Sequence, residues 1–166
     1  MTLSHQRAAS HSSTQDATQT EGQGLAVRCQ CGYISFRTPT AQPLRIACCH
    51  CTSCRKQSAS AFGSSAFYPA DAFISNLPQE AKDRLQLFTL TADSGNKKYC
   101  YFCPRCGVRL YGHSHKPDGT PLGLVTIKAG CVEDLEWKDV IHIWTRSAVV
   151  PIPEGVMQYE KGPPPL

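Results

Sequence analysis

The sequence of 166 residues contains no apolar run of 18 residues, so it predicts no membrane-spanning helix. Its N-terminal segment lacks the charged and apolar stretches of a secretory signal, and we expect a cytoplasmic protein. The net charge is only +4, and no basic run is interleaved with aromatic residues. We therefore expect neither a membrane nor a nucleic acid as a partner.

Large apolar side chains are scarce at the two ends of the chain. Residues 1–24 are rich in Ser, Thr, Gln, His and Gly, and such a segment cannot bury enough surface to offset the entropy of ordering. Residues 161–166 are a short Pro-rich end. We therefore expect a disordered tail at residues 1–24, one folded domain at residues 25–160 and a Pro-rich tail at residues 161–166.

Short stretches of apolar residues, or of alternating apolar and polar residues, recur along the domain and are separated by turn residues. With 12 Gly and 12 Pro to turn the chain, they predict a mainly β domain of short strands with little helix. One or two helical turns are expected at 53–57, and a turn or short helix at 69–73. The predicted strands are a hairpin at 25–36, followed by 61–68, 84–89, 98–102, 108–112, 122–129 and 140–144.

Ten cysteines stand out from this composition, and in a reducing compartment they indicate metal or thiol chemistry rather than disulfides. Cys103-Pro-Arg-Cys106-Gly has the spacing of a zinc knuckle, in which a tight turn aims two thiolates at one point. The glycine supplies the positive φ that such a turn requires. Cys29-Gln-Cys31-Gly offers the same trailing glycine on a hairpin. Together the two pairs predict a structural zinc site with four cysteine ligands.

A second group places three thiols within six residues. Cys49 and Cys51 share one face of an extended segment, and a turn after Cys51 can bring Cys54 to the same point. Three ligands without an obvious fourth are typical of a reactive zinc with an open position, which suits an incoming thiolate. Two alternatives stay open: Cys48 or His50 completes a closed structural site, or the group is a metal-free thiol switch.

Charged and aromatic residues near these groups are candidates for the substrate site. Arg55 and Lys56 follow the three cysteines directly, and their positive charge would moderate the negative charge of three coordinated sulfurs. His142 and Trp144 lie on one side of a predicted strand. They belong either to the core or rim of the domain or to the lining of a substrate cleft.

Taken in order, these motifs resemble the glutathione-dependent formaldehyde-activating enzymes, a family that shares a domain with centromere protein V. The resemblance covers about residues 25–159, nearly the whole expected domain. The three cysteine groups in this order are specific to the family, whereas His-Ile-Trp alone is not. The segments that carry it are Cys29-Gln-Cys31-Gly, Cys49-His-Cys51-Thr-Ser-Cys54-Arg-Lys, Phe-Cys103-Pro-Arg-Cys106-Gly and His142-Ile-Trp144.

The resemblance implies a β-tent zinc-binding fold of antiparallel sheets that holds two zinc ions. The structural ion would be bound by Cys29, Cys31, Cys103 and Cys106, and the catalytic ion by Cys49, Cys51 and Cys54. The family's reaction joins glutathione and formaldehyde into S-(hydroxymethyl)glutathione, formally the reverse of a carbon–sulfur lyase. The expected partner is a small-molecule thiol or thiol adduct, and the expected substrate-binding residues are Arg55, Lys56 and Trp144.

Other functions are compatible with the same cysteines. In one alternative, both zinc ions are structural and the sheet is a non-catalytic binding module for a protein partner. In another, the cysteines form a metal-responsive or thiol-redox sensor. The sequence leaves the oligomeric state open, with a homodimer as one option.

Overall fold

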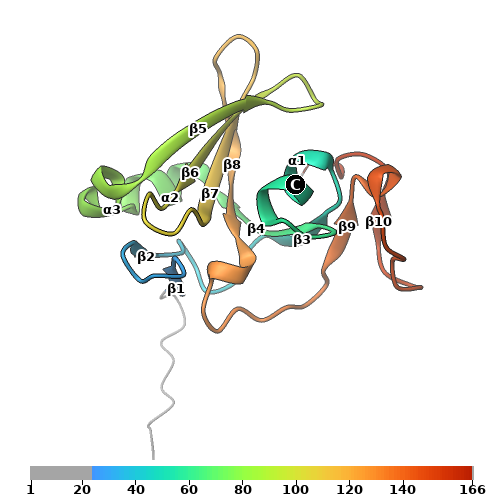
Figure 1. Cartoon of the computed structure of the whole chain (residues 1–166), viewed down its shortest axis with the longest axis horizontal. Helices are drawn as coiled ribbons and strands as arrows, with labels where there is room; N and C mark the ends of the chain where they lie inside the picture. The colour runs from blue at the N-terminus through green and yellow to red at the C-terminus, as the bar shows by residue number, and fades with distance from the viewer. Residues whose placement is uncertain (1–23, 166) are drawn as a thin grey trace, which may run out of the picture.

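The computed structural model describes residues 24–165 as two β-sheets with three short α-helices. A small sheet pairs β1 (Ala26–Arg28) with β2 (Ser35–Arg37), and the large sheet has the order β10-β9-β3-β4-β8-β7-β6-β5 (Figure 1). The prediction of a mainly β protein is confirmed. The strands of the large sheet are β3 (Arg45–Cys49), β4 (Gly63–Pro69), β5 (Gln86–Thr91), β6 (Lys97–Phe102), β7 (Arg109–His115), β8 (Pro121–Lys128), β9 (Ile141–Ile143) and β10 (Gln158–Tyr159).

The large sheet is antiparallel except at one end. There β9 pairs in parallel with β3, and β10 pairs in parallel with β9. The chain beyond β10 continues along this end, where the carbonyl of Lys161 accepts a hydrogen bond from the N–H of Trp144 at 3.0 Å. The carbonyl of Pro164 accepts one from Arg45 at 3.1 Å. The tail predicted at residues 1–24 lies outside the described residues, apart from Gly24.

Three short helices lie between the strands, and none of the helices in residues 24–165 is long and apolar enough to cross a membrane. Helix α1 (Thr52–Ser58) and helix α2 (Ala70–Asn76) lie where short helical segments were predicted. Helix α3 (Gln79–Arg84) is not predicted by the sequence. Because it includes residue 84, the strand predicted to begin there begins at residue 86 instead. Pro78 precedes α3 and favours a helix start, and Arg84 pairs with Glu80 one turn away.

The alternation of side chains along the strands separates two apolar clusters. On β3, Ile46 belongs to the larger cluster, whereas Ala47 and Cys49 belong to the smaller one. On β8, Ile127 is buried in the larger cluster, and its neighbour Lys128 lines a cavity beside the smaller one. One face of the large sheet therefore forms the main core, and the other face carries the cysteine triplet (Cys49, Cys51 and Cys54).

Helix α2 is attached to the main core by aromatic contacts. The ring of Phe73 lies 4.8 Å from that of Tyr111 on β7 and 5.6 Å from that of Phe36 on β2, measured between centroids, and both contacts are edge-on. Phe73 is 1% exposed, whereas its neighbour Ile74 is 43% exposed. This one side chain therefore joins the helix, the small sheet and the large sheet.

Phe73→Ala should lower the free energy of unfolding by about 3–5 kcal/mol, because it removes a buried ring and leaves a cavity among three elements. Urea denaturation at constant metal content measures the change. Ile74→Ala on the same helix is the matched control and should change stability by less than about 1 kcal/mol. Equal losses for the two variants would contradict this description of the core.

Candidate metal centres

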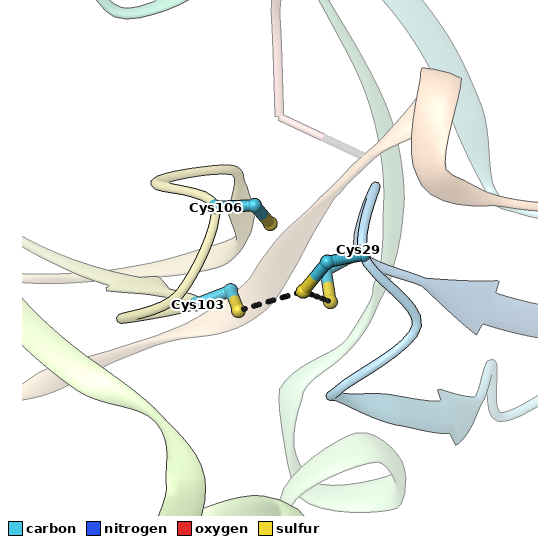
Figure 2. A group of neighbouring side chains, drawn as sticks. Cys29, Cys103 and Cys106 are labelled. Atoms are coloured by element: carbon cyan, nitrogen blue, oxygen red, sulfur yellow. Dashed lines mark hydrogen bonds between the residues drawn. The ribbon is translucent and has the colours of Figure 1, made fainter.

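Four cysteines from two distant turns converge on one point. Cys29 and Cys31 follow β1, and Cys103 and Cys106 lie between β6 and β7. Their Sγ atoms lie within 4.8 Å of one another, with 3.6 Å from Cys29 to Cys31 and 3.8 Å from Cys31 to Cys103. Figure 2 shows Cys103 and Cys106 directed from their turn toward Cys29. Four thiolates about 2.3 Å from a tetrahedral ion are about 3.8 Å apart, so these residues fit a closed metal site.

A glycine closes each of the two turns, as the sequence predicts. Gly32 and Gly107 have φ angles of +71° and +73°, in the left-handed region that residues with a Cβ rarely adopt. The N–H of each glycine donates to the carbonyl of the first cysteine of its pair, at 3.0 Å for Cys29 and 2.9 Å for Cys103. These hydrogen bonds hold the thiols of each pair on the same side of the turn.

The two turns also contact each other away from the sulfur atoms. The guanidinium of Arg105 lies over the ring of Tyr33, with Cζ 3.4 Å from the ring centroid. Burial alone would raise the pKa of Cys106, but the backbone N–H groups of Val108 and Cys31 donate to its sulfur and lower the pKa to about 6. A thiolate that forms this readily is a good metal ligand.

The cysteine triplet lies where β3 ends and α1 begins. Cys49 is the last residue of the strand, Cys51 is the N-cap of the helix, and Cys54 lies in its first turn. Their Sγ atoms lie within 4.8 Å of one another, and the N–H of Cys54 donates to Cys51 Sγ at 3.4 Å. Within residues 24–165, no fourth Cys, His, Asp or Glu belongs to this group. The protein can therefore offer three thiolates to one metal ion here.

Neither of the residues considered as a fourth ligand joins the triplet. The alternation of the strand turns Cys48 and His50 to the face opposite Cys49. Nε2 of His50 is 2.9 Å from Nδ1 of His142, and the two rings are stacked with their centroids 5.1 Å apart. The ring of Phe62 lies 5.4 Å from that of His50. The histidines are thus part of the packing behind the triplet.

The triplet lies in an electropositive environment. Hydrogen bonds from the thiols of Cys49 and then Cys51 hold the pKa of Cys54 far below its ordinary value, although burial opposes this shift. The positive charges of Lys128 and Lys98 lower the pKa of Cys54 further. Soft thiolates in such surroundings are suited to a soft or borderline metal ion.

A cavity of about 220 Å³ opens beside the triplet. Part of its lining is apolar and comes from Ala47, Phe67, Leu90, Ile143 and Trp144. Another part is polar and lies on three neighbouring strands, β6, β7 and β8, with Lys98, Arg109, Ser114, Thr126 and Lys128. In Figure 1 these strands and the β9–β10 end of the sheet lie on either side of α1. The cavity thus joins a thiol cluster to both apolar and charged surfaces.

The three residues predicted to bind substrate occupy different positions. Trp144 lines the cavity, with a left-handed φ of +57°. Arg55 does not line it, because its guanidinium donates to the carbonyl of Ser147 at 2.9 Å and so supports the turn that follows Trp144. Lys56 is exposed to solvent outside the cavity. Their roles toward a substrate stay predictions.

The basic residues of the cavity were not identified from the sequence. Lys98, Arg109 and Lys128 are spread over three strands, and each looks like an ordinary surface charge when its strand is considered alone. The sequence contained one sign that Lys98 faces inward. Lys98 lies two positions before Cys100, which is fully buried, so both side chains lie on the same face of β6. Only the order of strands in the sheet brings the three charges together.

Cys103→Ser and Cys54→Ser should have different effects on metal content and folding. Loss of Cys103 should lower the free energy of unfolding by about 3 kcal/mol or more, because a closed site joins two parts of the chain. Loss of Cys54 should leave the fold intact and remove one of two bound metal ions. Elemental analysis and circular dichroism measure both, with Cys131→Ser as the control. If Cys54→Ser unfolds the chain as badly as Cys103→Ser, both sites are structural.

A comparison with known protein families finds a match that includes the cysteines. The family model described as glutathione-dependent formaldehyde-activating enzyme matches residues 24–147, which is most of the chain. The match includes both cysteine groups and Trp144, and it ends before β10. Among curated proteins, none matches the sequence significantly. The chain therefore belongs to the family of glutathione-dependent formaldehyde-activating enzymes.

Proposed function

We propose that this protein is a zinc-dependent enzyme that forms and cleaves the carbon–sulfur bond of a thiol adduct, with glutathione and formaldehyde as its reactants. The supporting observation is that three cysteine thiols meet beside a cavity without a fourth protein ligand in the described residues. A purely structural zinc normally has four protein ligands, whereas a catalytic zinc keeps one position for water or substrate. The four-cysteine group would hold the structural ion.

The chemistry assigned to the triplet is addition of a thiol to an aldehyde. Cys49, Cys51 and Cys54 would hold the second zinc, which when bound supplies positive charge that favours the thiolate form of the substrate. The substrate sulfur attacks the carbonyl carbon of formaldehyde, and a carbon–sulfur bond forms. The carbonyl π electrons move to the oxygen, which receives the proton lost by the thiol. The reverse reaction breaks the same bond, as in a carbon–sulfur lyase.

Trp144 would position the substrate from the apolar side of the cavity. Its backbone is held from two directions, by the carbonyl of Lys161 that accepts its N–H and by the following turn that Arg55 supports. A non-glycine residue with a left-handed φ persists only where its surroundings fix it. An indole carried by this fixed backbone beside the triplet would exclude water from the reacting carbon and orient the aldehyde.

A reducing, cytoplasmic environment would suit this chemistry. All ten cysteines of the chain are free in the structure. Disulfides are rare in compartments where thiols are kept reduced, and thiolate metal sites are stable there. We therefore include a cytoplasmic location in the proposal.

The proposed activity can be measured as exchange between free formaldehyde and its glutathione adduct at equilibrium, followed by ¹³C NMR. The zinc-loaded protein should increase the exchange rate above the rate without protein. Cys54→Ser should lose at least about 99% of this increase, because a ligand of the catalytic ion is removed. Cys131→Ser, which alters a thiol outside both groups, should keep the wild-type rate.

Two results would count against this activity. One is an exchange rate that the zinc-loaded wild-type protein does not change at any protein concentration. The other is an increase that survives in a folded Cys54→Ser variant, since the reaction would then not depend on the triplet. A binding module without catalysis predicts the first of these results.

A further inference from the structure

The cavity beside the triplet collects positive charge from three neighbouring strands. Lys98 comes from β6, Arg109 from β7 and Lys128 from β8, and all three line the same cavity. The uncharged polar residues of these strands that line it are Ser114 and Thr126. Basic side chains that line a cavity destabilise the folded protein unless an anionic group pairs with them, because they lose part of their hydration.

None of these three basic residues has an acidic partner within residues 24–165. The ion pairs of the described chain join other residues: Arg28 with Glu133, Arg84 with Glu80, Lys138 with Glu136, and Arg146 with Asp93. Asp93 is the acidic residue that lines the cavity, and its partner Arg146 lies 3.9 Å away. The basic side of the cavity is therefore not neutralised by the protein's own carboxylates.

Lys98 is held in a defined position rather than free on the surface. Its Nζ donates to Thr126 Oγ1 at 2.9 Å, and that hydroxyl in turn donates to the carbonyl of Gly112 at 3.0 Å. The stem of the lysine crosses Gly112 so closely that a Cβ at that position would lie 2.7 Å from Lys98 Cε. Burial lowers the pKa of Lys98 to about 8, and the positive charges of Lys128 and Arg109 lower it further, whereas the thiols of Cys100 and Cys54 oppose the shift.

Lys128 brings the same charge next to the triplet. A Cβ on Gly63 would lie 3.4 Å from Lys128 Nζ and 3.3 Å from Cys54 Cβ, so the ammonium and the cysteine flank one small space. The absence of a side chain at Gly63 thus permits this approach. A molecule whose sulfur lies at the triplet would place its other groups within reach of Lys128 and then Lys98.

The charges of the site do not balance without a further anion. Three thiolates that bind one divalent ion have a net charge of about −1. The basic residues at positions 98, 109 and 128 outweigh this charge, and they continue to do so after one substrate thiolate has bound. A second negative group on the substrate, separate from its sulfur, would complete the balance.

We propose that Lys98, Arg109 and Lys128 form an anion subsite that binds a carboxylate of the substrate thiol, so that the enzyme selects thiols that carry a carboxylate over neutral thiols. This proposal rests on the proposed function, because the sulfur of the same molecule must bind at the triplet. Thr126 and Gly112 are positioning residues that act through Lys98. The half-buried Arg55 and the exposed Lys56, which follow the triplet in sequence, lie outside this subsite.

A rival explanation is that these basic residues only offset the charge of the coordinated cysteines. The two explanations predict different affinities for a matched pair of ligands, 3-mercaptopropionate and 3-mercaptopropionamide. These ligands have nearly the same shape but differ in charge. Charge compensation at the metal would affect both ligands alike. A carboxylate subsite would affect the acid alone, and one charged contact is worth about 10- to 100-fold in affinity.

The test is isothermal titration of the zinc-loaded protein of 166 residues with each ligand. Wild-type protein should bind the acid at least about 10-fold more tightly than the amide. Lys98→Met and, independently, Lys128→Met should reduce this ratio toward one. Lys97→Met is the matched control, because Lys97 is exposed, lies outside the cavity and carries the same charge. Gly112→Ala retains every charge but displaces Lys98, so it should also reduce the ratio.

The outcomes separate the subsite from the proposed function. If acid and amide bind equally to wild-type protein, thiol binding at the triplet stands and the anion subsite is wrong. If the ratio is unchanged in folded Lys98→Met and Lys128→Met variants, other residues bind the carboxylate and the assignment is wrong. If neither ligand binds, the proposed function fails and the subsite fails with it. Circular dichroism and zinc content verify that each variant is folded and loaded.

Discussion

The convergence of two cysteine turns is the constraint on which the rest of the structure depends. Cys31 and Cys103 are 72 positions apart, yet their sulfur atoms lie 3.8 Å from each other. This contact joins the β1–β2 hairpin to the turn between β6 and β7, and Arg105 over Tyr33 adds a second contact between them. A metal ion bound there would close a long loop, and its binding free energy would contribute directly to folding.

The large sheet uses its two faces for different purposes. One face is covered by the small sheet and α2 and forms the main core, which contains Phe73 and Ile127. The other face carries the triplet, the basic residues of β6 to β8 and Trp144. Because successive residues of a strand alternate between the faces, Lys128 lines the cavity although its neighbour Ile127 is fully buried. Stability and the proposed chemistry are therefore supplied by alternate residues of the same strands.

The sequence was sufficient to predict those features that depend on local spacing. The two cysteine groups, the glycines after Cys31 and Cys106 and the mainly β fold follow from spacing and turn chemistry, and the structure agrees. Features that depend on tertiary contacts were missed. The contact of Arg55 with the carbonyl of Ser147, a residue far away in sequence, is one example, and a role of Arg55 toward the substrate stays a prediction. Lys98 could not be assigned to the cavity without the order of the strands.

The central claim is that the triplet holds a zinc ion with one ligand position available to a thiol. X-ray absorption at the zinc edge measures the sulfur ligands of the fully loaded protein before and after saturation with glutathione. With one four-cysteine and one three-cysteine site, the mean should be about 3.5 sulfur ligands per zinc and should rise to about 4 with the thiol bound. A mean of about 4 before glutathione, or a mean that glutathione does not change, would contradict the account.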